Sequence, residues 1–170
     1  MTEFETKLAA CLDANLPGFK SLISVERLSG GASQETYRIE IHAEDGARLV
    51  AMRRAPGGEV VEPTPGHPGL AAEALLMQSA KAVGVPEPEV FHILTGEDGL
   101  GDGFIMEWLD GIALGAKVVR APELDEVRPR LAYLCGEILA KIHQIDLGAT
   151  GLDKCLELIT PAEYIDQTWQ

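Results

Sequence analysis

Residues 28–41, LSGGASQETYRIEI, contain the pattern that decides the fold. β-Branched and aromatic residues dominate Leu22 to Leu28 before the turn and Thr36 to His42 after it, which is typical of strands. Gly30 and Gly31 lie between the two runs, and glycine readily adopts the backbone angles of tight turns. The pattern predicts a hairpin with a glycine-rich turn.

Further apolar runs extend this hairpin into a sheet. Residues 48–58, RLVAMRRAPGG, follow the turn signal Glu44–Gly46 and predict a third strand that ends at two arginines. Val90 to Leu94 and Phe104 to Trp108 predict two more strands. Residues 55–69 are rich in proline and glycine, so we expect a long surface loop without regular structure there.

Helical patterns mark four segments. Thr2–Glu5 is a capping box ahead of an N-terminal helix, and Leu70 to Ala80 has apolar residues at helical spacing. Leu131 to Ile142 has an apolar stripe, and a further helix begins at Thr160–Glu163. The order of elements predicts an α+β fold, with a five-stranded antiparallel sheet, one packed helix and the first helices of a helical region.

The composition excludes several classes of protein. The chain has 170 residues, of which 46% are hydrophobic, enough for a buried core. Its formal net charge of -13 predicts neither a nucleic acid nor a membrane as a partner. The N-terminus has no leader pattern, so we expect a cytoplasmic protein. Cys11, Cys135 and Cys155 are far apart in the sequence and predict neither a disulfide framework nor a zinc site.

Two groups of residues are candidates for binding a ligand. Backbone N–H groups of the glycine turn, with the hydroxyl of Ser33, can approach phosphate oxygens, although glycine hairpins that bind nothing are more common. Arg53 ends an apolar strand and Glu73 lies on the apolar side of its helix. An ion pair between them would aim the guanidinium group at a phosphate. Two independent, solvated charges explain this pair of residues equally well.

Taken in order, these features resemble the aminoglycoside phosphotransferase and choline kinase superfamily, relatives of the protein kinases. The resemblance runs from about Leu22 to the end of the chain. Besides the two stretches quoted above, AAEALLMQSA (71–80), GFIMEWLDG (103–111) and LAYLCGEILAKIHQIDL (131–147) carry it. It implies a kinase-like nucleotide-binding N-lobe over residues 1–110, then a linker and the start of a helical C-lobe over residues 111–170.

The resemblance also implies binding residues for ATP, with Mg²⁺ as the second cofactor. The residues over the ATP phosphates would be Gly30, Gly31, Ser33 and Gln34. The phosphates would also contact Arg53, with Glu73 as its partner on the helix. The adenine pocket would be formed by Met106, the backbone C=O of Glu107 and the backbone N–H of Leu109.

Catalytic residues are not found. The superfamily uses a His-Gly-Asp-x-x-x-x-Asn segment and a later Asp, and no histidine of this chain is followed by Gly-Asp. The helix that begins at Thr160 has no stop signal before Gln170. We therefore expect a chain truncated before its catalytic lobe and inactive by itself, with the Mg²⁺ ligands in the missing lobe.

The intact protein is expected to transfer the γ-phosphate of ATP to a hydroxyl group of a small molecule. An aminoglycoside, choline, an amino acid and a hydroxyacyl thioester all remain open as acceptors. One alternative is a non-catalytic module that binds a nucleotide or a partner protein, and another is an interaction domain whose glycine turn and ion pair are structural. The stripe on residues 131–142 predicts an exposed apolar patch and self-association.

Overall fold

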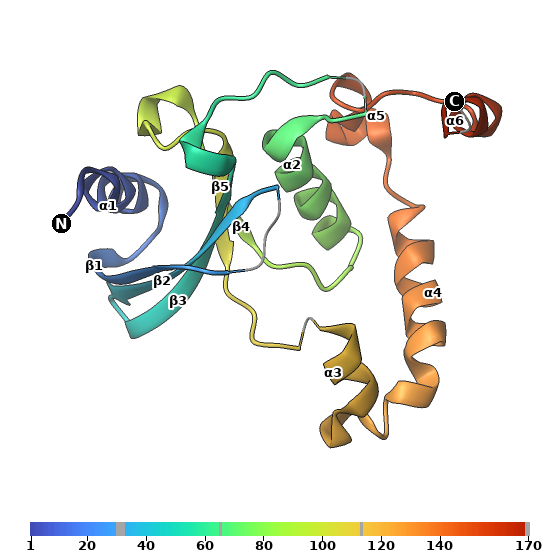
Figure 1. Cartoon of the computed structure of the whole chain (residues 1–170), viewed down its shortest axis with the longest axis horizontal. Coiled ribbons are helices and arrows are strands. Elements are labelled where there is room, and N and C mark those ends of the chain that lie inside the picture. The colour runs from blue at the N-terminus through green and yellow to red at the C-terminus, as the bar shows by residue number, and fades with distance from the viewer. Residues whose placement is uncertain (30–32, 65, 113, 169–170) are drawn as a thin grey trace.

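The computed structural model describes residues 1–29, 33–64, 66–112 and 114–168. Five strands form one antiparallel sheet in the order β1-β2-β3-β5-β4 (Figure 1). Their bounds are β1 Phe19–Arg27, β2 Glu35–Ala43, β3 Gly46–Arg54, β4 Val90–Ile93 and β5 Gly103–Glu107. The α+β class and the five-stranded antiparallel sheet predicted from the sequence are therefore confirmed.

Helix α1 (Glu3–Asn15) covers one face of this sheet. It begins at the predicted capping box, in which the Glu5 N–H donates to Thr2 Oγ1 and the Thr2 N–H donates to Glu5 Oε2. The larger hydrophobic core lies between α1 and the sheet. Its fully buried members include Leu8, Leu12, Ile39, Ile41, Val50 and Met52.

Helix α2 (Gly69–Ala82) packs against the opposite face. A second core cluster, of Ala55, Leu70, Ala74 and Phe104, lies there. The helix includes the predicted Leu70 to Ala80 segment and ends before Gly84, whose φ of 85° is one that glycine adopts without strain. The sheet is thus covered by a different helix on each face.

Strand β3 places one arginine on each face of the sheet. Arg54 is paired with Glu35 of β2 in the strand register, and Arg53 is paired with Thr36. Because successive side chains of a strand point to opposite faces, Arg54 lies on the α1 side and Arg53 on the α2 side. Two adjacent arginines therefore belong to two separate polar groups.

The connection from β3 to α2 is the predicted long loop, with one difference. It contains a short 3-10 turn, η1 (Pro56–Gly58), where no regular element was expected. Proline fixes φ at the start of this turn, and Gly57 adopts a φ of 66°. Further along the loop, Thr64 and His67 exchange two backbone hydrogen bonds of 3.1 and 2.8 Å.

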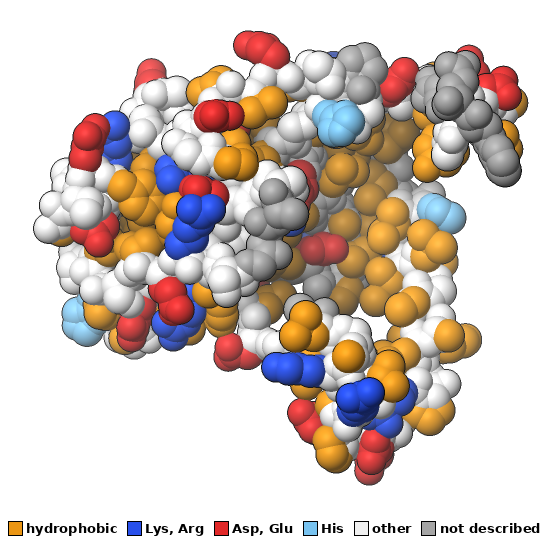
Figure 2. Space-filling model, viewed as in Figure 1, with side chains coloured by type: hydrophobic (Ala, Val, Ile, Leu, Met, Phe, Trp, Pro, Cys, Tyr) orange, Lys and Arg blue, Asp and Glu red, His pale blue; other side chains and the backbone are white. Residues whose placement is uncertain are grey.

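After β5 the chain is helical, with α3 (Gly115–Arg120), α4 (Leu131–Ile142), α5 (Leu147–Thr150) and α6 (Pro161–Thr168). Helix α4 has the predicted bounds, and none of its residues is buried. Tyr133 and Leu139 are 66% and 51% exposed, and Figure 2 shows hydrophobic side chains along this part of the surface. The predicted exposed apolar patch is present.

Two contacts tie the helical segment to α2 and the turn that follows it. Leu152, in the short turn η5 (Leu152–Lys154), is fully buried, and η5 packs against α2. Lys141 Nζ of α4 donates to the carbonyl of Gly84, 2.9 Å away. Among the described helices, none has the length and apolar character to cross a membrane.

Candidate functional site

The ion pair predicted from the sequence is present in the structure. Arg53 Nη1, at the end of β3, contacts Glu73 Oε1 on α2. Glu73 reaches the sheet because α2 packs there through Leu70 and Met77, about one turn before and after it. Both side chains are only partly exposed, 39% for Arg53 and 32% for Glu73. The pair joins α2 to the sheet and restrains the orientation of the guanidinium group.

Gln34, which directly precedes β2, lies beside this pair. Its Nε2 lies 3.5 Å from Glu73 Oε2. Gln34 Oε1 and Arg53 Nε are buried, and neither has a hydrogen-bond partner within the described part of the chain. Buried polar atoms without a partner are rare, and Gln34, which lines an adjacent cavity, offers one to a ligand or a water molecule.

A cavity of about 520 Å³ lies next to these residues. Ser33, Gln34 and Glu73 line one part of it, and the 55–69 loop lines another through residues such as Val61 and His67. Three of the predicted site residues therefore share one cavity.

The start of α2 also lines this cavity, through Pro68, Gly69 and Leu70. The first turn of the helix has no acidic residue and no side chain that caps it. Free N–H groups and the helix dipole make such an end favourable for an anion. Two carboxylates, of Glu73 and Asp102, also line the cavity, and Arg53 lies behind Glu73 as its ion-pair partner. The helix end and Arg53 are therefore the features of this site that favour an anion.

Asp102, which was not predicted as a site residue, holds the wall of the cavity in place. Its carboxylate oxygen Oδ2 accepts from the Val61 N–H at 2.6 Å, and its carbonyl accepts from the Ala55 N–H at 2.8 Å. Asp102 itself lines the cavity. Its position in a Gly-Asp-Gly turn is a weak signal, because aspartate is common in turns of every kind.

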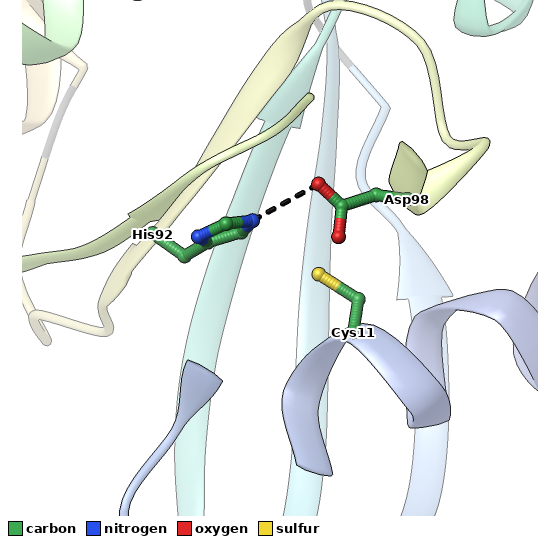
Figure 3. A group of neighbouring side chains, drawn as sticks. All are labelled: Cys11, His92 and Asp98. Carbon is green, nitrogen blue, oxygen red and sulfur yellow. Dashed lines mark hydrogen bonds and ion pairs between the residues drawn. The ribbon is translucent and has the colours of Figure 1, made fainter. Parts of the chain in front are cut away.

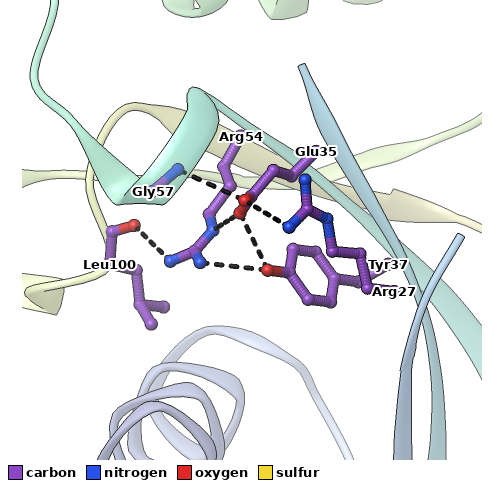
Figure 4. Close-up of polar contacts among 6 residues, drawn as sticks. All are labelled: Arg27, Glu35, Tyr37, Arg54, Gly57 and Leu100. Carbon is purple, nitrogen blue, oxygen red and sulfur yellow. Dashed lines mark hydrogen bonds and ion pairs between the residues drawn. The ribbon is translucent and has the colours of Figure 1, made fainter. Parts of the chain in front are cut away.

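On the other face of β3, a second polar group was also missed. Glu35 is buried, and its carboxylate accepts from Arg54 Nε at 2.9 Å, from the Tyr37 hydroxyl at 2.8 Å and from the Gly57 N–H at 3.2 Å (Figure 4). Arg27 Nη1 lies 3.1 Å from the same carboxylate. The signal was available, since a strand that directs Arg53 to one face must direct Arg54 to the other.

This group fixes the ends of β2 and β3 beside the cavity. Arg54 Nη1 also donates to the carbonyl of Leu100, so the group ties η1 and the loop before β5 to the strands. Burial by itself raises the pKa of Glu35, but the hydrogen bonds from Tyr37, Gly57 and Arg54 outweigh it and lower the pKa below the usual value of 4.5. The carboxylate is therefore charged at neutral pH.

The residues predicted to bind adenine lie outside this cavity. Met106 packs against the α2 core cluster, and Leu109 is exposed beyond the end of β5. The carboxylate of Glu107 accepts from the Glu89 N–H at 3.1 Å. The Leu109 N–H makes no backbone hydrogen bond to another described residue. The adenine-binding role of these residues stays a prediction.

Gly30 and Gly31, predicted to lie over the phosphates, are outside the described residues. Their described neighbour Ser33 is exposed and lines the cavity. The structure thus brings Ser33, Gln34 and Glu73 to one cavity, with Arg53 bound to Glu73.

Comparisons with known proteins identify the family. Residues 24–167 match the model of the phosphotransferase enzyme family. A probable acyl-CoA dehydrogenase of Arabidopsis thaliana is 26% identical over 148 residues, which are 82% of this chain and 17% of that protein. Acyl-CoA dehydrogenase family member 10 of Mus musculus is 30% identical over 125 residues, which are 72% of this chain and 11% of that protein.

The chain therefore corresponds to a small part of these much longer relatives. The family match covers most of the chain, and it includes the end of β1, strands β2 to β5, α2 and the residues of the cavity. It agrees with the superfamily that the strand and helix motifs resemble. The chain belongs to the phosphotransferase enzyme family.

Proposed function

We propose that this chain binds the phosphates of ATP and is the nucleotide-binding part of a kinase that phosphorylates a hydroxyl group of a small molecule. The observation that carries the proposal is the Arg53 guanidinium group, bound to Glu73 beside a cavity that also receives the start of α2. A fixed cation and a helix N-terminus both favour a phosphate group.

The residues present fit such a ligand. Arg53 Nε is a buried donor with no partner among the described residues, and a phosphate oxygen would accept its hydrogen bond. Ser33 would add a hydroxyl donor at the mouth of the cavity, and Glu73 would keep the guanidinium group from turning away. ATP, when bound, supplies the phosphoryl group, and Mg²⁺ neutralises its negative charge. We assign no Mg²⁺ ligand and no catalytic base to the described residues.

The names of the relatives favour one acceptor class. Both proteins are named as acyl-CoA dehydrogenases, and each contains a segment similar to this chain. A kinase segment within such a protein is best explained if the kinase segment and the dehydrogenase both act on acyl thioesters. We therefore propose a hydroxyacyl thioester, rather than an aminoglycoside, choline or an amino acid, as the acceptor.

Calorimetric titration with MgATP tests the phosphate site. Arg53→Ala is expected to weaken binding at least about tenfold, because a hydrogen bond to a charged group contributes about 1.5 kcal/mol or more. Glu73→Gln keeps the Arg53 cation but removes its ion-pair partner, so a smaller loss of MgATP affinity is expected. Lys20→Ala is the control, since Lys20 is an exposed cation paired with Glu44 elsewhere on the sheet. Equal affinity of the Arg53→Ala variant and the wild type would refute the assignment.

The acceptor needs a separate experiment on the native gene product isolated from its own cells. Its intact mass is compared with the 18.3 kDa of this chain. The product is then incubated with Mg²⁺, ATP labelled in the γ-phosphate and one acceptor of each class. Label on a hydroxyacyl-CoA supports the proposal, and label on a different acceptor overturns the acceptor class alone. Binding of MgATP without transfer to any acceptor would favour a non-catalytic nucleotide-binding module.

A further inference from the structure

Three side chains that can hold a metal ion meet on the α1 side of the sheet. They are Cys11 of α1, His92 of β4 and Asp98 of the short turn η2 (Gly96–Asp98), and Figure 3 shows them pointing toward one another. One ligand atom of each lies within 4.8 Å of the others. Cys11 is buried, and the His92 and Asp98 side chains are only 18% and 11% exposed.

Neighbouring residues hold two of the three groups in place. Asp98 Oδ2 accepts from the Thr95 N–H at 2.7 Å and from the Thr95 hydroxyl at 3.0 Å. The other carboxylate oxygen of Asp98 points toward the sulfur of Cys11 (Figure 3). Asn15 Nδ2 lies 3.9 Å from Cys11 Sγ and donates to it. Such supporting hydrogen bonds fix the ligands of metal sites.

The group is accessible to solvent. Cys11, His92 and Asp98 line an open depression of about 580 Å³. Lys7 lies on its rim, but its charge is already paired with Glu3, 2.8 Å away. An ion can therefore enter from solvent, and a water molecule has room to complete its coordination.

We propose that Cys11, His92 and Asp98 bind a zinc ion, with water as the fourth ligand. This departs from the expectation from cysteine spacing, because the ligands meet only in the folded chain. Sulfur, nitrogen and oxygen donors together are the set that Zn²⁺ accepts, whereas Mg²⁺ and Ca²⁺ prefer oxygen alone. The site lies on the face of the sheet opposite α2, so it is separate from the proposed phosphate site. It uses a cysteine and a histidine that the proposed kinase function does not need.

The geometry needs little change to accept the ion. Ligand atoms around tetrahedral zinc lie about 3.4 to 3.6 Å apart, given the usual Zn–S, Zn–N and Zn–O distances. His92 Nε2 and Asp98 Oδ2 are now 3.0 Å apart, so a small rotation of the imidazole ring opens the required space. Zn²⁺ binds the thiolate form of cysteine, so binding of the ion releases the Cys11 proton into solvent.

A zinc ion here would join three segments that are far apart in the sequence. Cys11 lies in the N-terminal helix, whereas His92 and Asp98 lie some eighty positions later, in an edge strand and the turn that follows it. The ion would fasten α1 to the sheet beyond the hydrophobic contacts of Leu8 and Leu12. We therefore expect it to stabilise the fold rather than to take part in phosphoryl transfer.

Cobalt titration of the purified chain tests the site, because Co²⁺ replaces zinc and a thiolate ligand gives a near-ultraviolet charge-transfer band. One equivalent of Co²⁺ is expected to produce the band. Zn²⁺ should abolish the band by displacing Co²⁺, and it should raise the Tm of the chain. Cys11→Ala should remove the band, because it removes the thiolate ligand. The fold should be kept, because alanine is another small apolar residue. His92→Gln and Asp98→Asn should weaken Co²⁺ binding at least tenfold.

The double variant Cys135→Ser, Cys155→Ser is the matched control, because it leaves Cys11 as the one remaining thiol. It should bind Co²⁺ as the wild type does. A folded wild-type chain that gives no band would overturn the proposal without any variant. Loss of the band in the double variant, or its persistence in Cys11→Ala, would show that another cysteine binds the metal.

Discussion

Replacing Glu35 by glutamine tests whether the polar group on the α1 side of β3 supports the fold. Glutamine keeps the size of the side chain and one acceptor oxygen but removes the negative charge. Arg54, which is only 12% exposed, would then keep its charge without a carboxylate partner. We expect a large loss of stability from this single change.

The magnitude follows from the contacts that the carboxylate makes. Loss of one partner of a buried ion pair costs about 3 to 5 kcal/mol. Arg54 retains hydrogen bonds to the carbonyl of Leu100 and the hydroxyl of Tyr37, and Arg27 is 60% exposed, so water replaces part of what is lost. We therefore expect a loss of about 2 to 3 kcal/mol in the free energy of unfolding, or about 4 to 12 °C in Tm for a chain of this size.

The measurement is urea unfolding of the wild type and the Glu35→Gln variant at several pH values. The pKa of Glu35 is lowered in the folded protein, so its contribution is fully present above the usual carboxyl pKa of 4.5. It is lost as the pH falls through the lowered value, because the folded state must then take up a proton. The difference in stability between the two proteins should be full at pH 7 and should shrink at acidic pH.

Glu44→Gln is the matched control, with the same chemical change at an exposed ion pair to Lys20. Exposed pairs contribute little to stability, so its unfolding midpoint should stay within error of the wild type. A Glu35→Gln variant no less stable than Glu44→Gln would refute the role assigned to the buried group. A stability difference that does not depend on pH would show that charge is not the cause.

Two further changes test the loops and the surface. Gly101→Ala should destabilise the chain by about 2 kcal/mol or more in urea unfolding. A Cβ at this position would lie 2.2 Å from the carbonyl oxygen of Gly58, and the backbone φ is 83°. Gly111→Ala is the control and should be neutral, because the space around Gly111 is open. Leu139→Lys on the exposed face of α4 should reduce self-association in light scattering, and a wild type that is monomeric at all concentrations would contradict this.

Much of the fold was predictable because local patterns specify it. The β-branched and aromatic run of residues 36–42, the capping box at Thr2 and the helix start at Thr160 depend on neighbours in the chain, and the structure confirms them. The Arg53–Glu73 pair was also predictable, since each residue was a charge on an otherwise apolar element. For the strand and the helix starts, the information lies within a few residues of the feature itself.

The sequence alone therefore determined the order of the main strands and helices, the α+β class and the family resemblance. It offered the Arg53–Glu73 ion pair as one of two alternatives, and the structure shows the pair. Only the tertiary structure decided that Glu35 meets Arg54, that Asp102 supports the cavity wall, and that Cys11 meets His92 and Asp98. The reason is physical: strand register, the packing of α1 and the path of the 55–69 loop set these distances. Both arise from summed contacts between distant segments, which no local pattern records.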